Sequence, residues 1–243
     1  MSGPAALVVP AIKRHTATII VAHGLGDSGN GWVFLAENWR RRNKFEEVKF
    51  VFPNAPNIPI TLNGGMRMPG WYDIVRKRDD SNTSLSAISQ AEDETGITRT
   101  QAYFHSLIAE EASKGIPTER IVLGGFSQGG AMSLFAGLTA PSKLGGIFGL
   151  SCYMLLQGKL KDKIAQSGSA NNTTKIFMGH GDDDQVVKYD WGKATADRLK
   201  EWGHEVDFKT YKNLPHSAAP EEIDDLEAFL NQVIPAQGDS SKV

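Results

Sequence analysis

One serine of this 243-residue chain stands in a setting typical of a hydrolytic nucleophile. Ser127 lies in Gly125-Phe126-Ser127-Gln128-Gly129, after an apolar, strand-like run and before residues whose apolar members recur at helical spacing. A G-x-S-x-G sequence between strand and helix is the nucleophile elbow, a sharp turn that lifts the serine oxygen above the sheet while glycines allow close packing. The alternative is a glycine-rich turn without catalytic partners, so the partners decide.

The general base is expected among the six histidines. Elbow hydrolases have the chain order serine, acid, histidine, which excludes every histidine before Ser127. Of the remaining three, His180 precedes any acid in its loop, and His204 lies in a turn that enters a strand at the opposite edge of the sheet. His216 follows the strand-like segment Val206 to Tyr211 and precedes the last helix. It is therefore the predicted base.

The acid is expected in the segment that follows the predicted strand at 175–178. This segment contains Asp182, Asp183 and Asp184, and spacing alone does not choose among them. The acid must accept a hydrogen bond from the imidazole and fix its tautomer, whereas the other aspartates are expected to bond to turn amides. Val186 and Val187 favour Asp184, because they can anchor that end of the loop against the core.

An oxyanion hole requires two backbone amides directed at the charge that develops on the substrate oxygen. The residue after the nucleophile, Gln128, supplies the first, and the loop after an early strand supplies the second. That loop is His23-Gly24-Leu25-Gly26-Asp27, in which we expect Leu25 to be the donor. The loop lacks the G-x-G-x-x-G and Walker patterns of phosphate-binding loops.

Strand-like and helical segments alternate along the chain. This alternation predicts an α/β fold with a mostly parallel central sheet and helices on both faces. The predicted strands are Ala17 to Ala22, Val48 to Phe52, Arg120 to Gly124, Gly146 to Leu150, Lys175 to Met178 and Val206 to Tyr211. The predicted helices are Trp32 to Arg42, Asp93 to Lys114, Gln128 to Ala140, Asp190 to Trp202 and Pro220 to Val233. We expect one domain, 1–235, a short disordered polar tail, 236–243, and a functional loop at 55–80.

Composition narrows the classes of partner. The net charge of -2 gives no reason to expect nucleic acid. One cysteine, Cys152, permits neither an internal disulfide nor a thiolate metal cluster. No apolar run approaches the length of a transmembrane helix, and Met1 to Pro10 does not resemble a signal peptide. We expect a cytoplasmic protein, with the nucleus as a second location.

Taken together, the motifs make the chain similar to the acyl-protein thioesterase and lysophospholipase family of the α/β-hydrolase superfamily. The segments that carry the resemblance are His23 to Asp27, Pro53 to Pro56, Gly70 to Asp73, Gly124 to Gly130, Ser151-Cys152, His180 to Asp184 and His216-Ser217. The resemblance implies that Ser127 is the nucleophile, Asp184 the acid and His216 the base, with Leu25 and Gln128 at the oxyanion hole. It implies no metal or cofactor.

Two segments depart from the family pattern. Gln185-Val186-Val187-Lys188 lacks the prolines that usually flank the apolar pair, which predicts a less rigid acid loop. Cys152 to Leu156 lacks the family's tryptophan and proline, which predicts an altered acyl groove. Arg40 to Glu47 and Ser81 to Ala91 are longer than in many relatives.

The resemblance implies hydrolysis of S-acyl thioesters, typically palmitoyl groups on protein cysteines, with ester hydrolysis as a further activity. Lysophospholipids or small soluble esters are the alternative substrates, and a catalytically silent binding scaffold is a third hypothesis. The implied partners are S-acylated proteins such as lipid-anchored G proteins, with transient contact to a membrane surface and a weak homodimer. An acyl channel is expected along seven apolar or aromatic residues: Leu62, Met66, Met68, Trp71, Tyr72, Leu155 and Leu156.

Overall fold

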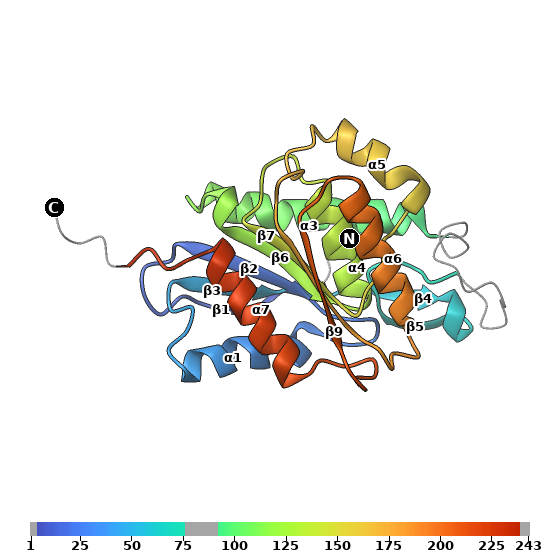
Figure 1. Ribbon diagram of the computed structural model, residues 1–243, viewed down its shortest axis with the longest axis horizontal. Coiled ribbons are helices and arrows are strands. Elements are labelled where there is room, and N and C mark those ends of the chain that lie inside the picture. The colour runs from blue at the N-terminus through green and yellow to red at the C-terminus, as the bar shows by residue number, and fades with distance from the viewer. Residues whose placement is uncertain (1–3, 76–91, 239–243) are drawn as a thin grey trace.

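A seven-stranded sheet forms the centre of the computed structural model, which describes residues 4–75 and 92–238 (Figure 1). The strand order is β1-β3-β2-β6-β7-β8-β9, and only β1 runs antiparallel to its neighbour. The strands are β1 (Leu7–Val9), β2 (Ala17–Ala22), β3 (Val48–Phe52), β6 (Ile121–Phe126), β7 (Gly146–Leu150), β8 (Ile176–Gly181) and β9 (Val206–Tyr211). Every residue of β2, β7 and β8 is buried, as expected for parallel strands covered on both faces.

Helices cover both faces of the sheet, and each face has its own apolar core. The α-helices are α1 (Val33–Arg41), α3 (Glu94–Ser113), α4 (Gln128–Leu138), α5 (Gln157–Gln166), α6 (Tyr189–Glu201) and α7 (Pro220–Val233). Figure 1 shows helices on both sides of the sheet. Side chains of α1 and α7 pack with one set of strand residues, while those of α3, α4, α5 and α6 pack with the alternate set. Ile19 and Ile20, adjacent on β2, belong to different cores, as strand geometry requires. The predicted fold class is confirmed.

The sequence did not predict the strands β1, β4 and β5 or the helix α5. Strand β1 has only three residues, and α5 buries only Leu160 and Ile164, so neither shows a long periodic pattern. The expected loop at 55–80 contains a hairpin of β4 (Asn57–Ile60) and β5 (Met66–Pro69), whose prolines obscure the strand signal. Short 3-10 helices occupy Gly29–Trp32, Thr61–Asn63 and Thr118–Arg120.

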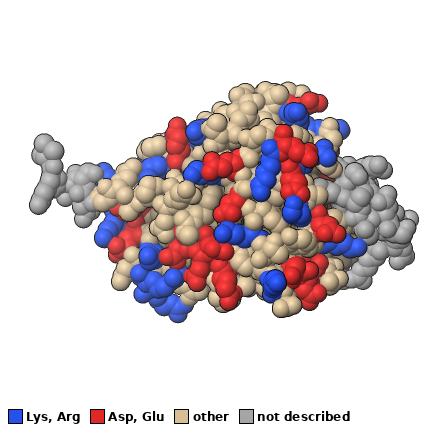
Figure 2. Space-filling view, viewed as in Figure 1, with Lys and Arg blue, Asp and Glu red and all other residues tan. Residues whose placement is uncertain are grey.

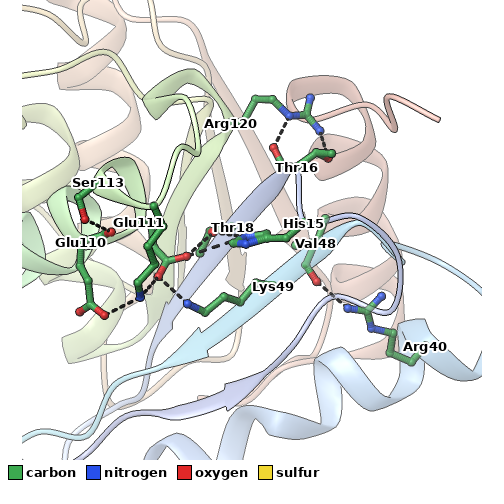
Figure 3. Close-up of polar contacts among 11 residues, drawn as sticks. His15, Thr16, Thr18, Arg40, Val48, Lys49, Glu110, Glu111, Ser113 and Arg120 are labelled. Atoms are coloured by element: carbon green, nitrogen blue, oxygen red, sulfur yellow. Dashed lines mark hydrogen bonds and ion pairs between the residues drawn. The ribbon is translucent and has the colours of Figure 1, made fainter. Parts of the chain in front are cut away.

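A buried carboxylate ties α3 to the amino-terminal ends of two parallel strands (Figure 3). Glu111 of α3 is 3% exposed and accepts hydrogen bonds from Thr18 Oγ1 of β2 at 2.9 Å and Lys49 Nζ of β3 at 2.5 Å. Lys114 Nζ lies 3.1 Å from the same carboxylate. This network stabilises the edge of the sheet opposite the elbow serine.

The long segment Arg40 to Glu47 comprises the last two residues of α1 and a loop. It lies at the same amino-terminal edge, because it leads directly into β3. Arg40 donates to the carbonyl oxygens of Phe45 and Val48, both at 2.5 Å. Arg42 forms an ion pair with Glu227 of α7, and Figure 2 shows basic and acidic side chains side by side in the region of α1 and α7. The loop therefore serves packing at the edge away from the site. The other long segment, Ser81 to Ala91, lies outside the described residues.

The residues after α7 turn back towards β3. The amides of Gln237 and Gly238 donate to the Glu47 carboxylate at 2.9 and 2.8 Å. These two residues of the predicted polar tail are therefore held in place, while 239–243 lie outside the described residues. The assignment of one domain stays a prediction. None of the described helices is long and apolar enough to span a membrane.

Candidate active site

Ser127 occupies a strained turn between β6 and α4. Its backbone has φ 53° and ψ -122°, outside the regions that residues with a side chain favour. Gly125 and Gly129 make the turn possible, since a Cβ on either would lie within 2.4 Å of the Ala22 carbonyl oxygen. The Ser127 amide donates to the Leu150 carbonyl oxygen at 2.8 Å. Close packing of β2, β6 and β7 therefore holds the elbow.

The loop after β9 brings His216 to the serine. His216 Nε2 lies 2.9 Å from Ser127 Oγ, and His216 Nδ1 lies 2.7 Å from Asp184 Oδ2. Because an ionised carboxylate can only accept, Nδ1 carries the proton and Nε2 presents its lone pair to the serine hydroxyl. The Phe126 ring lies against the imidazole, with ring centroids 4.8 Å apart. This is the geometry of a serine activated by a general base.

Asp184 is the aspartate that reaches the imidazole. Its other oxygen, Oδ1, accepts from the amides of Val186 and Val187, both at 2.9 Å. Burial favours the neutral acid, but the hydrogen bonds, led by those from His180 and His216, outweigh burial and hold the pKa of Asp184 far below its usual range. The carboxylate is thus charged wherever His216 acts as a base.

The prediction that both valines after Asp184 anchor the loop is right for Val187 and wrong for Val186. Val187 is buried in the apolar core, whereas Val186 is 65% exposed and does not anchor the loop. The backbone amides of both residues also fix the carboxylate. His180 adds a further contact, because it is fully buried and its Nε2 lies 2.8 Å from the Val187 carbonyl oxygen and 3.4 Å from Asp184 Oδ2.

Among the described residues, the other two aspartates do not bond to backbone amides of their own turn, which corrects the prediction. Asp182 Oδ1 accepts from the Asn213 amide at 2.6 Å, which ties the acid loop to the loop that carries His216. Asp183 is exposed, and its Oδ1 lies 3.3 Å from Gln185 Nε2. His204 follows α6 and precedes β9, so it lies at the opposite edge of the sheet.

The two predicted oxyanion donors, Leu25 and Gln128, lie in segments that adjoin the serine. Gln128 is the first residue of α4, where a backbone amide has no acceptor within its own helix. The loop that contains Leu25 runs past the elbow, since a Cβ on Gly24 would lie 3.4 Å from Ser127 Cβ. His23 fixes that loop: the Ala55 amide lies 3.1 Å from its Nε2, and its Nδ1 lies 2.7 Å from the Gly24 carbonyl oxygen. The sequence did not predict this role of His23.

The seven expected channel residues do not share one environment. Trp71, Tyr72, Leu155 and Leu156 are at most 5% exposed and belong to the apolar core. Met66 is 65% exposed, whereas Leu62 and Met68 are half-buried. A Cβ on Gly26 would lie 3.9 Å from Met68 Sδ, which places this methionine beside the oxyanion loop. Met68 is therefore a half-buried residue beside this loop, whereas Trp71 and Tyr72 contact the site from within the core.

Trp71 and Tyr72 support the site from inside the core. Trp71 Nε1 donates to the His23 carbonyl oxygen at 2.7 Å, and the hydroxyls of Tyr72 and Tyr153 lie 3.1 Å apart. This hydroxyl pair joins the segment after β5 to the segment after β7. The contacts of Trp71 and Tyr72 are those of structural residues, not of an exposed acyl groove.

Comparison with known proteins identifies the family. The chain matches the family described as Phospholipase/Carboxylesterase over residues 4–234. It is 56% identical to "Acyl-protein thioesterase 1" of Emericella nidulans over 98% of each chain, and 53% identical to the protein of that name from Neurospora crassa over 97% of this chain and 94% of the relative. The crystal structure of Zea mays acyl-protein thioesterase 2 superposes with a TM-score of 0.79 at 29% identity, covering 94% of this chain and 98% of that chain. This chain therefore belongs to the phospholipase/carboxylesterase family of α/β-hydrolases.

Proposed function

We propose that this protein is an acyl-protein thioesterase, which hydrolyses S-acyl groups on protein cysteines through an acyl-serine intermediate. The observation that carries the proposal is the continuous hydrogen-bonded chain from Asp184 through His216 to Ser127. The names of the relatives support thioesters as the substrate class. The family description, Phospholipase/Carboxylesterase, supports carboxylic esters, including phospholipids, as a second class.

Acylation begins when Ser127 Oγ attacks the thioester carbonyl carbon and His216 Nε2 takes the hydroxyl proton. The carbonyl oxygen becomes an oxyanion, which the amides of Leu25 and Gln128 stabilise. Collapse of this intermediate breaks the carbon–sulfur bond, and His216 returns the proton to the departing cysteine sulfur. The products are a free thiol and an acyl ester of Ser127.

Deacylation repeats these steps with water as the nucleophile. His216 takes a proton from water as the oxygen attacks the acyl carbon, and the same two amides stabilise the second oxyanion. The bond to Ser127 Oγ then breaks, the proton returns to that oxygen, and the fatty acid is released. Asp184 stays ionised throughout and stabilises the imidazolium formed in each half-reaction.

Turnover of three matched substrates tests this function: an S-palmitoyl protein, a lysophospholipid and a short-chain aryl ester. Wild-type protein is expected to cleave all three substrates, including the thioester of the S-palmitoyl protein. The Ser127→Ala variant controls for uncatalysed hydrolysis. Fast ester cleavage beside negligible thioester cleavage would contradict the thioesterase proposal in favour of an esterase. Absence of Ser127-dependent labelling by a fluorophosphonate would favour the silent scaffold.

The setting of the substrate follows from its chemistry. S-acylated proteins, such as lipid-anchored G proteins, hold their acyl chains in a membrane, so the proposed enzyme works at a membrane surface by transient contact. We propose cytoplasmic and nuclear locations and a weak homodimer. Fluorescence imaging of the tagged protein tests the first, and sedimentation velocity over a concentration series tests the second.

A further inference from the structure

The side chain of Gln128 is buried and fully engaged with one backbone segment. It is 3% exposed, and its Oε1 accepts a hydrogen bond from the Trp71 amide at 2.8 Å. Its Nε2 donates to the carbonyl oxygen of Tyr72, also at 2.8 Å. A carboxylate could not donate to that carbonyl, and an apolar side chain could form neither bond. The carboxamide thus fits this pair of backbone groups at both ends.

The same segment also holds the loop that contains Leu25. Trp71 Nε1 donates to the carbonyl oxygen of His23 at 2.7 Å, two residues before Leu25. The Gly26 amide, one residue after it, donates to the Pro69 carbonyl oxygen at 2.8 Å. The segment 69–72 is therefore bonded to both flanks of Leu25 on one side and to the Gln128 carboxamide on the other.

We propose that the Gln128 side chain is a positioning residue for the oxyanion hole, because it ties the first residue of α4 to the segment that holds Leu25. This inference rests on the proposed acyl-transfer function. The backbone amide of Gln128 contacts the oxyanion, whereas the side chain acts only through the separation and direction of the two amides. Segment 69–72 is the common support that sets both.

The expected signature is a loss in the chemical step. An oxyanion exists only in the transition state and the tetrahedral intermediate, so misplaced amides lower kcat and leave ground-state binding almost unchanged. Displacement of a catalytic group by about 1 Å can cost on the order of 100-fold. A residue that only supported the fold would instead lower the amount of folded enzyme and leave the properties of the remaining active sites intact.

The test compares Gln128→Met, which keeps length but forms neither bond, and Gln128→Asn, which keeps the amide but is one methylene short. The control is Gln101→Leu on α3, a half-buried glutamine whose Nε2 donates to Thr139 Oγ1 at 2.6 Å. The readouts are kcat and KM on an aryl ester and an S-acyl thioester, Ki for a trifluoromethyl ketone that forms an oxyanion adduct with serine, and the melting temperature.

Both Gln128 variants are expected to lose about 10- to 100-fold in kcat. Their KM should stay within about threefold, and their Ki should rise in parallel with the loss in kcat/KM. Gln101→Leu should keep wild-type values. If Gln128→Met does not fold, Gln128→Asn decides. A folded Gln128 variant with unchanged kcat and Ki would overturn the inference.

The outcome for the proposed function is separate. Esters and thioesters form the same oxyanion, so a wild-type protein that cleaves only the ester contradicts the thioesterase proposal, and the Gln128 variants are then judged on the ester alone. A wild-type protein that cleaves both, beside variants with wild-type kcat and Ki, contradicts the role of the Gln128 side chain alone.

Discussion

Replacement of the buried Glu222 by glutamine is expected to stabilise the protein, and increasingly so at alkaline pH. Glu222 lies in the first turn of α7 with no exposed surface, and neither carboxyl oxygen has a hydrogen-bond partner among the residues that the structure describes. The carboxyl packs against β8, because a Cβ on Gly179 would lie 2.3 Å from its Oε1. Burial raises the pKa of Glu222 to about 8, because removal from water disfavours the charged carboxylate. The backbone of Ala219 offsets part of this rise in pKa, and the negative charge of Asp225 adds to it.

The sign of the effect follows from proton binding. Between the ordinary glutamate pKa of 4.5 and the folded value of about 8, the unfolded chain has released a proton that the folded chain keeps. Stability therefore falls as pH rises through this window and is constant above it. Each pKa unit corresponds to about 1.4 kcal/mol, so the full effect is at most about 5 kcal/mol, of which about 3 kcal/mol is present at pH 7.

Urea denaturation at pH 5, 7 and 9 measures this effect. Glu222→Gln should match the wild type within about 1 kcal/mol at pH 5 and exceed it by about 3 to 5 kcal/mol at pH 9. The matched control is Glu221→Gln, an exposed neighbour in the same helical turn, which should change the free energy of unfolding by about 0.5 kcal/mol or less. A difference that does not depend on pH, or a less stable Glu222→Gln at pH 9, would show that the protein does not lose stability when Glu222 ionises in its buried site.

Three further substitutions test the site and its support. Asp184→Asn should lower kcat about 10⁴-fold in a folded protein, because the amide favours the wrong imidazole tautomer. Asp183→Asn should retain activity. Equal steady-state rates for the two variants would count against Asp184 as the acid. Gly129→Ala should lower the free energy of unfolding by about 3 kcal/mol or more, since its Cβ would lie 2.3 Å from a carbonyl oxygen. Gly158→Ala, in the exposed first turn of α5, should raise it by about 0.5 to 1 kcal/mol. A thermal melt that shows a gain at both positions would contradict the close packing at Gly129. Lys49→Met removes a partner of the buried Glu111 carboxylate shown in Figure 3 and should lower the free energy of unfolding by about 3 kcal/mol. An unchanged midpoint of urea denaturation would contradict this prediction.

The nucleophile elbow could be predicted from the local sequence. A strand pattern, a serine between glycines and a helical pattern predicted the turn at Ser127, because each of these signals lies within one short segment. Chain order and strand ends then selected His216 without a measured distance, since loops after parallel strands meet at one edge of the sheet. In the structure both residues lie at that edge, and His216 Nε2 is 2.9 Å from Ser127 Oγ.

The acid loop marks the limit of such reasoning. Three adjacent aspartates have the same local spacing, and only the fold shows that Asp184 faces the imidazole from a neighbouring strand. The role assigned to Val186 was wrong for a related reason: a backbone amide directed at a carboxylate leaves no trace in side-chain hydrophobicity. Trp71 was expected to line a channel but is buried in the core. The sequence cannot separate these two settings, since aromatic residues occur in both.

The sequence by itself determined the alternation of strands and helices, the elbow serine, the histidine that follows the last strand and the family to which these motifs point. Each of these depends on periodicity, on chain order or on contiguous motifs, which are properties of a linear chain. The packed fold is needed to show how Asp184 is held, that Gln128 bonds to Trp71 and Trp71 to the oxyanion loop, and that Glu222 is buried with no hydrogen-bond partner among the described residues. These depend on distances between residues far apart in the chain and on the exclusion of water from their contacts, and both arise only when the sheet and its helices have packed.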